Sequence, residues 1–299
     1  MEHTAAGIRV RDRKNGVLFQ EQVYGEGALQ WVYGTPLGRA LESSILSKRP
    51  VSSLMGAYHD SSWSTSKIPT FIKRYGIPME EFESGPFSNF NEFFIRRFKP
   101  GARPFAAAPA LAAFSEGRYF AWDKTTDTTA VPVKNALLSP RELLSDAVSE
   151  EQSRRLAGGP LLLARLCPTD YHRFHFPDSG QWISCRRVSG RLHSVNPVAL
   201  TIRPRTFLDN ERQVSILECD SLGLIAYVEV GALGVGKIVQ SRISSGRFER
   251  GEEKGYFLFG GSTVIVIGEP GRWKPDSDLI QNTTEGFETL IRLGESLAR

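Results

Sequence analysis

The stretch that most constrains this chain is GYFLFGGSTVIVI, residues 255–267. Two apolar runs of strand-forming residues flank a Gly-Gly-Ser-Thr break. Glycine inside a strand marks a bulge or a place where another group must approach the backbone. The two glycines leave the Gly261 carbonyl sterically open beside the Ser262 hydroxyl, which can attack it if a base removes the hydroxyl proton. The alternative is a plain strand–turn–strand hairpin.

The overall composition excludes several classes of protein. With 37 basic and 33 acidic residues, the net charge of +4 is far from a nucleic-acid signature. Cys167, Cys185 and Cys219 have no C-x-x-C spacing, which predicts reduced intracellular thiols and neither a disulfide framework nor a zinc site. The first residues lack the apolar segment of a signal peptide, and no apolar run is long enough for a membrane-spanning helix. Both observations leave open a soluble protein and a protein that lies on a membrane surface.

The first hundred residues predict a mostly helical region that follows a small hairpin within residues 1–24. Thr35 before Pro36 is typical of a helix N-cap, and further helices are expected over 67–75 and from Asn89 onward. Amphipathic helices that carry aromatic and basic residues suit a bilayer surface. Packing on the second half of the chain is an equally good interpretation.

The pattern changes at Lys99-Pro100-Gly101, so we divide the chain into a helical region, residues 1–100, and a β-rich catalytic domain, residues 101–299. The expected strands are separated by Gly, Pro, Asn and Asp and predict an antiparallel sheet system. They cover residues 161–166, 182–188, 214–218, 223–230, 237–241 and the 255–267 stretch. A C-terminal helix is expected over residues 283–297. The predicted fold class is α+β.

One motif resembles a phosphate-binding loop but lacks its context. Residues 231–237, GALGVGK, match its first seven positions. The eighth is Ile238, which cannot ligate magnesium, and a strand is expected there in place of the required helix. Nucleotide binding is therefore not expected.

The histidines supply a candidate base for Ser262. Two of the five, His172 and His175, lie in the run DYHRFHFP. A zinc site would need a third ligand, and no Cys or His supplies one nearby. Either histidine alone could be a satisfied loop residue, but the pair favours acid–base chemistry, since imidazole both takes and gives a proton near neutral pH.

These features occur in an order that resembles the self-processing, pyruvoyl-dependent phosphatidylserine decarboxylase family. The matching stretches extend over most of the chain. They are NEFFIRRFKPGARP (91–104), DYHRFH (170–175), SVNPV (194–198), NER (210–212), VEVGA (228–232), GEEKGYF (251–257) and the Gly261-Ser262-Thr263 run. The start of the chain and the GFETL tail (286–290) fit one subgroup.

The resemblance implies a mechanism for Ser262. Its hydroxyl attacks the Gly261 carbonyl, and elimination then splits the chain into residues 1–261 and 262–299 with a pyruvoyl group at position 262. His175 corresponds to the base for this cut, oriented by a carboxylate as in a serine-protease triad. The pyruvoyl group is the electron sink for decarboxylation, and His172 corresponds to the residue that assists decarboxylation and reprotonation. The implied product is phosphatidylethanolamine.

The orienting carboxylate is where this chain departs from the family. The family has an Asp followed by Gly, whereas here the aligned acid is Glu116, one methylene longer; Asp123 is a possible substitute. Orientation effects are steep, since about 1 Å of misplacement costs on the order of a hundredfold in rate. A second hypothesis is therefore an unprocessed relative that binds lipid without chemistry. A third is a serine hydrolase, although Ser262 lacks the Gly-x-Ser-x-Gly context.

The resemblance also implies partners. We expect a peripheral protein on an anionic phospholipid surface, at the cytoplasmic face of the cell membrane, with a homodimer as the assembly and no metal. Basic residues are candidates for contact with phosphate or anionic lipid. They are Arg96, Arg97, Lys99, Arg103, Arg186, Arg187 and Arg191.

Overall fold

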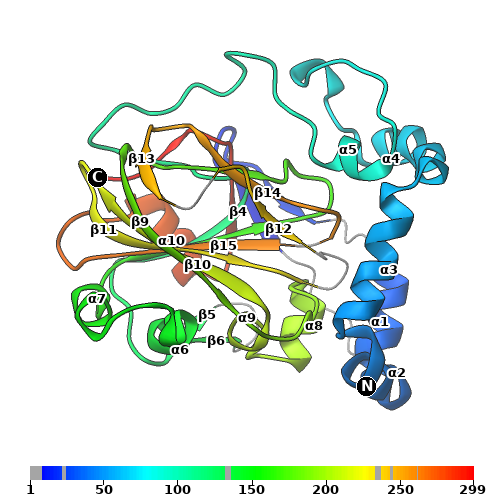
Figure 1. Ribbon diagram of the computed structural model, residues 1–299, viewed down its shortest axis with the longest axis horizontal. Helices are drawn as coiled ribbons and strands as arrows, with labels where there is room; N and C mark the ends of the chain where they lie inside the picture. The colour runs from blue at the N-terminus through cyan, green and yellow to red at the C-terminus, as the bar shows by residue number, and fades with distance from the viewer. Residues whose placement is uncertain (1–8, 22–24, 132–135, 233–236, 243–244, 261) are drawn as a thin grey trace.

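A computed structural model describes residues 9–21, 25–131, 136–232, 237–242, 245–260 and 262–299 (Figure 1). The α+β prediction is confirmed: a large, almost wholly antiparallel sheet is flanked by helices. The only parallel neighbours in this described sheet are β1 and β16. The ten strands, in spatial order, are β13 (Gly246–Phe248), β9 (Gly180–Val188), β10 (Arg212–Cys219), β11 (Gly223–Val230), β15 (Ser262–Gly268), β7 (Leu161–Leu166), β4 (Gly117–Trp122), β16 (Glu288–Ile291), β1 (Arg9–Asp12) and β2 (Leu18–Gln20).

Three smaller sheets complete the β-rich part. A three-stranded sheet holds β12 (Ile238–Gln240), β14 (Glu253–Phe257) and β8 (Arg173–His175). Two pairs are formed by β3 (Leu111–Ala112) with β17 (Ser296–Ala298) and by β5 (Thr129–Val131) with β6 (Ala136–Leu138). The strand expected after the phosphate-loop-like motif is confirmed as β12, whereas residues 233–236 of that motif lie outside the described residues.

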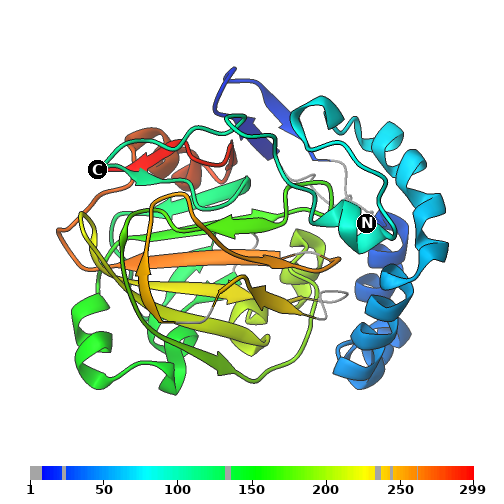
Figure 2. The ribbon, with the colours of Figure 1, turned by 45° about the horizontal axis from the view of Figure 1, so that its top comes forward.

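The helical N-terminal region is also confirmed and lies along one side of the β-rich body in both views (Figures 1 and 2). It contains α1 (Glu26–Gly34), α2 (Pro36–Leu41), η1 (Glu42–Leu46), α3 (Arg49–Asp60), η2 (Ser62–Lys67), α4 (Ile68–Tyr75), η3 (Met79–Glu81) and α5 (Phe90–Phe94). The expected Thr35 cap forms, with its hydroxyl accepting from Gly38 N at 2.9 Å. The helix expected near Asn89 is confirmed as α5, and the Asn89 side chain caps it by accepting from Glu92 N at 2.9 Å. The expected hairpin is confirmed as β1–β2.

The remaining helices flank the sheet. They are α6 (Pro140–Leu144), η4 (Ser145–Ala147), α7 (Glu150–Leu156), α8 (Pro197–Ile202), α9 (Thr206–Asp209) and α10 (Ser277–Thr284). No helix in the described ranges is both long enough and apolar enough to cross a membrane.

The central strand β15 shows how the sheet is packed. Val264 and Val266 join one buried apolar cluster, whereas Ile265 and Ile267 join another. Successive side chains of a strand point to opposite faces, so a strand buried on both faces has an unbroken apolar sequence. A third cluster places Phe90 and Phe94 of α5 against Phe259, next to the Gly-Gly-Ser break. The helical region therefore packs directly on the segment that leads to Ser262.

The predicted C-terminal helix is wrong. Helix α10 ends at Thr284, and the chain then forms β16 and β17. Gly286 and Gly294 adopt φ values of 78° and 84°, a left-handed conformation that does not continue a helix. The backbone N–H and C=O groups that would have bonded within the expected helix lie instead in β16, which pairs with β4 and β1.

Candidate active site

Two adjacent strands bring Ser262 to the histidine segment. Ser262 begins β15 and is paired with Leu166, the last residue of β7. The chain turns after β7, where Asp170 N donates to Cys167 O at 2.9 Å, and then enters the segment that contains His172. As a result, the Ser262 hydroxyl oxygen lies 3.3 Å from His172 Nδ1, and both side chains are completely buried. Gly261, the other half of the predicted cleavage site, lies outside the described residues.

The second ring nitrogen of His172 fixes the tautomer. Nε2 lies 2.8 Å from the carbonyl oxygen of Cys167. A carbonyl can only accept a hydrogen bond, so Nε2 carries the proton and Nδ1 presents a lone pair to Ser262. This is the arrangement that a base needs in order to receive the hydroxyl proton.

The surroundings keep His172 neutral. The ring of Phe94 is stacked on the imidazole, with centroids 3.8 Å apart and planes at 20°. Burial lowers the pKa of His172 to about 3, and the positive charges of Arg96 and Arg118 act in the same direction. Helix α5 of the N-terminal region therefore supplies one wall of the site.

His175 lies nearby but has other partners. Its Nδ1 is 2.9 Å from the carbonyl oxygen of Gly251, and its Nε2 is 3.1 Å from the Tyr171 hydroxyl. Nδ1 therefore carries the proton and Nε2 accepts from Tyr171. Burial lowers the pKa of His175 to about 4. Within the described residues, the structure gives His175 no hydrogen bond to Ser262.

The candidate carboxylates are also held elsewhere. Glu116 accepts two hydrogen bonds from Arg103, at 2.7 Å from Nε and 3.0 Å from Nη2, and a third from Leu293 N at 3.1 Å. Asp123 forms an ion pair with Lys274 at 3.3 Å. Neither acid contacts a histidine in the part of the chain that the structure describes. The role of Glu116 as the orienter of His175 stays a prediction.

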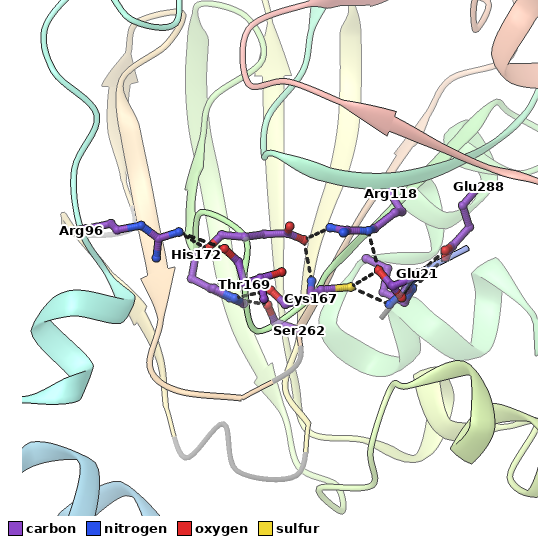
Figure 3. A network of polar contacts seen from close by, with 10 residues as sticks. Glu21, Arg96, Arg118, Cys167, Thr169, His172, Ser262 and Glu288 are labelled. Atoms are coloured by element: carbon purple, nitrogen blue, oxygen red, sulfur yellow. Dashed lines mark hydrogen bonds and ion pairs between the residues drawn. The ribbon is translucent and has the colours of Figure 1, made fainter. Parts of the chain in front are cut away.

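A buried ionic network lies behind His172 (Figure 3). Arg165 forms ion pairs with Glu288 at 2.5 Å and with Glu21 at 2.8 Å, and all three side chains are almost completely buried. Arg118 joins Glu21 to Asp170. Burial opposes ionisation of Glu21, but the two arginines outweigh it and hold its pKa at about 2. Charges removed from water in this way are stable only when they are paired.

The network reaches His172 through Cys167. Asp170 accepts from Cys167 N at 2.7 Å, and the Cys167 thiol donates to Glu21 at 2.7 Å. Burial raises the pKa of this thiol, so it stays protonated and able to donate. Because the same residue offers its carbonyl to His172, the ionic network holds the group that fixes the histidine tautomer.

The residues of this ionic network are not among the site residues predicted from the sequence. Arg165 had a visible signal, since it is the only charged residue in the apolar strand Leu161–Leu166. A buried arginine requires buried acids as partners. Glu21, by contrast, precedes α1 and lies 97 residues before Arg118 and 144 residues before Arg165, and no local pattern identifies it.

Comparison with known proteins identifies relatives over almost the whole chain. The family model described as "Phosphatidylserine decarboxylase" matches residues 90–299. A phosphatidylserine decarboxylase proenzyme of Ruminiclostridium cellulolyticum is 40% identical over 97% of this chain and 97% of its own length. Proteins with the same name are 39% identical in Clostridium perfringens, over 97% and 99% of the two chains, and 38% identical in Chlamydia felis, over 96% of each.

Proposed function

This chain belongs to the phosphatidylserine decarboxylase family of carboxy-lyases, and from that premise we propose that it converts phosphatidylserine to phosphatidylethanolamine after cutting itself between Gly261 and Ser262. The observation that carries the proposal is the buried contact of 3.3 Å between the Ser262 hydroxyl and the unprotonated Nδ1 of His172. The name "proenzyme" of the relatives agrees with processing of a precursor.

In the proposed cut, Ser262 Oγ bonds to the Gly261 carbonyl carbon, the peptide C–N bond breaks, and the hydroxyl proton is passed by a base to the freed nitrogen. Loss of the Ser262 Cα proton then breaks the Cβ–Oγ bond and leaves Gly261 with a free carboxylate. Hydrolysis of the resulting dehydroalanine releases ammonia and leaves a pyruvoyl group at position 262. The reaction consumes one water molecule and needs no oxidant.

The residues around Ser262 fit a pyruvoyl group at this place. A pyruvoyl ketone supplies an electron sink for decarboxylation. His172, neutral and fixed in one tautomer, is assigned to proton transfer at position 262, including reprotonation of the product carbon. Phe94 and the apolar third cluster keep bulk water away from the imidazole.

The base for the cut is assigned to His175 on the family resemblance, with Glu116 as its proposed orienter. The geometry offers His172 as the alternative base, since it is the histidine in contact with Ser262. Single His172→Ala and His175→Ala variants separate the two assignments. If replacing a histidine leaves the chain uncut, that histidine is the base for the cut. If the variant still cuts but no longer decarboxylates, that histidine acts in proton transfer during decarboxylation.

Intact mass under denaturing conditions tests the main proposal. We expect two chains, residues 1–261 and 262–299, with a carbonyl-reactive group at the start of the shorter one. Ser262→Ala should stay whole, and Ser262→Cys is the conservative control because a thiol is also a nucleophile. A wild-type chain that stays whole after long incubation would refute self-processing and favour an unprocessed lipid-binding relative. Labelling of uncut protein by a fluorophosphonate would favour a serine hydrolase.

We also propose that the N-terminal helical region, residues 1–100, docks on an anionic membrane surface at the cytoplasmic face, and that residues 101–299 carry the catalysis. Between residues 31 and 63, seven large apolar side chains are exposed in the described structure. Leu37, Leu54 and Trp63 are the most exposed, at 71%, 74% and 82%. Such a surface in contact with water is typical of a membrane or protein interface. The exposed residues are Trp31, Leu37, Ile45, Leu54, Met55, Tyr58 and Trp63.

Two of the basic residues expected at lipid do not fit that role. Arg96 is buried and donates to the backbone oxygens of Thr169 and Asp170, at 2.9 and 3.2 Å. Arg103 is held by Glu116 and Glu81. The apolar surface is therefore the better-supported contact. Vesicle flotation tests this contact: Leu54→Glu and Trp63→Glu should lose binding to phosphatidylglycerol vesicles, whereas Ile183→Glu should not, because Ile183 is exposed, at 49%, but lies on β9, outside the helical region. Sedimentation of the same samples tests the proposed homodimer.

A further inference from the structure

Asn91 connects the end of α3 to the segment that leads to Ser262. Its side-chain oxygen accepts a hydrogen bond from Phe259 N at 2.9 Å, and its side-chain nitrogen donates to Asp60 Oδ1 at 2.7 Å. Asn91 is almost completely buried, and Asp60 is the last residue of α3. These three residues, Asp60, Asn91 and Phe259, form a chain of contacts that ends three positions before the proposed nucleophile.

The contact with Asp60 decides which end of the Asn91 amide faces Phe259. A carboxylate can only accept, so the amide nitrogen must point to Asp60. The amide oxygen is then turned toward Phe259 N, which needs an acceptor. Without Asp60, the amide of Asn91 would be free to reverse, and its nitrogen would face another donor. Asp60 therefore acts through Asn91 and does not itself contact the segment before Ser262.

Phe259 is a suitable place to hold the backbone. It is followed by two glycines, and Gly260 has φ 141°, in a region that favours glycine. Glycine at position 260 has conformational freedom that works against a fixed geometry of attack. On the far side, Ser262 is held by pairing with Leu166 of β7. On the near side, two contacts restrain the chain: the hydrogen bond from Phe259 N to Asn91, and the tilted ring of His59, whose centroid lies 4.1 Å from that of the Phe259 ring.

We propose that Asn91, oriented by Asp60, is a positioning residue for the cut between Gly261 and Ser262. This inference rests on the proposed self-processing. Asn91 contacts none of the reacting atoms. It holds the backbone at Phe259, three positions before Ser262, and an error of about 1 Å in the geometry of attack costs on the order of a hundredfold in rate.

A reciprocal exchange tests the proposal on the full chain. Asn91→Leu removes the acceptor for Phe259 N and should slow self-cleavage by roughly tenfold to a hundredfold. Asn91→Asp places two carboxylates side by side with no donor between them and should also cut slowly. Asp60→Asn alone leaves an oxygen that can accept from Asn91 and should change the rate by less than about threefold. The double variant Asp60→Asn with Asn91→Asp restores a donor–acceptor pair and should recover most of the wild-type rate.

Two further measurements separate positioning from folding. Each change is repeated with Ser262→Ala, and thermal unfolding of the uncut chains shows whether they are folded at the assay temperature. Hydroxylamine cleaves an ester between Gly261 and Ser262, so it reports which step is slow. If Asn91 positions the attack, hydroxylamine should not accelerate cutting of Asn91→Leu, because little ester forms.

The possible results are distinct. Slow cutting by folded Asn91→Leu and Asn91→Asp, with recovery in the exchanged pair, supports the proposal. Wild-type rates in folded Asn91→Leu, or no recovery in the exchanged pair, overturn it while leaving self-processing intact. Accumulation of the ester in Asn91→Leu also overturns it, because the attack would then be unaffected. A wild-type chain that never cuts overturns the proposed function, and this inference with it.

Discussion

Replacing Glu116 by glutamine tests the role of this carboxylate, which stands where the family has an aspartate. The structure shows Glu116 as an anchor for Arg103 and Leu293, bonded at 2.7, 3.0 and 3.1 Å. Glutamine keeps one acceptor oxygen but removes the charge. Hydrogen bonds to charged groups contribute about 1.5–3 kcal/mol each, and the glutamine oxygen retains part of this contribution. We therefore expect the free energy of unfolding to fall by about 1–3 kcal/mol.

The matched control is Glu81→Gln, which removes the second carboxylate on the same guanidinium, at 2.6 Å from Nη2. Glu81 is one-third exposed, so solvent screens the pair and its loss should cost at most about 1 kcal/mol. Urea unfolding in the Ser262→Ala background measures both changes without interference from self-cleavage.

The rate of self-cleavage distinguishes the two roles of Glu116. If it is an anchor, both variants should cut within about threefold of wild type at a temperature where they are folded. If it orients His175, Glu116→Gln alone should lose about a hundredfold, and Glu116→Asp should cut at least as fast as wild type. The second pattern would refute the anchor interpretation and support the family triad.

Three other predictions concern stability, each measured by urea unfolding of uncut Ser262→Ala protein. Unfolded histidine titrates near 6.5, whereas His172 and His175 stay neutral down to about 3 and 4. The unfolded state therefore binds more protons below pH 6.5, and each histidine should lower the free energy of unfolding by about 2 kcal/mol between pH 6.5 and pH 5. His172→Gln should remove the contribution of His172, which is about half of the combined loss from the two histidines; an unchanged slope of unfolding free energy against pH would contradict this prediction. Arg165→Met leaves the Glu288 and Glu21 carboxylates buried without their shared partner and should cost about 3–5 kcal/mol. Arg155→Met should cost less than about 1 kcal/mol, because the Arg155 guanidinium paired with Glu269 is more than one-third exposed to solvent. Gly255→Ala places a Cβ 2.2 Å from the Val239 oxygen and should cost about 1–3 kcal/mol, whereas Gly56→Ala, which meets no atom within 4 Å in helix α3, should stabilise by up to about 1 kcal/mol. Equal losses of stability in Arg165→Met and Arg155→Met would refute the argument from burial of the ion pairs. Equal effects of Gly255→Ala and Gly56→Ala would refute the argument from close backbone contact.

Local chemistry determined much of this protein. The apolar run of β-branched residues at 264–267 predicted a strand, which the structure confirms as part of β15. Thr35 before Pro36 identified a helix start, because a cap is satisfied within three residues. The Gly-Gly-Ser break and the histidine pair identified the candidate site, because few side chains can serve as nucleophile and base.

Only the tertiary structure decided which partners these residues have. The sequence could not place His172 rather than His175 against Ser262, because that depends on the turn between β7 and β8. It could not show that Glu116 binds Arg103, or that Glu21 enters the ionic network behind Cys167. The C-terminal segment was misjudged for the same reason: its apolar residues suited a helix, but the open edges of β4 and β1 offered strand pairing. Contacts between residues far apart in the chain leave no periodic signal, so their partners are set by the packed fold.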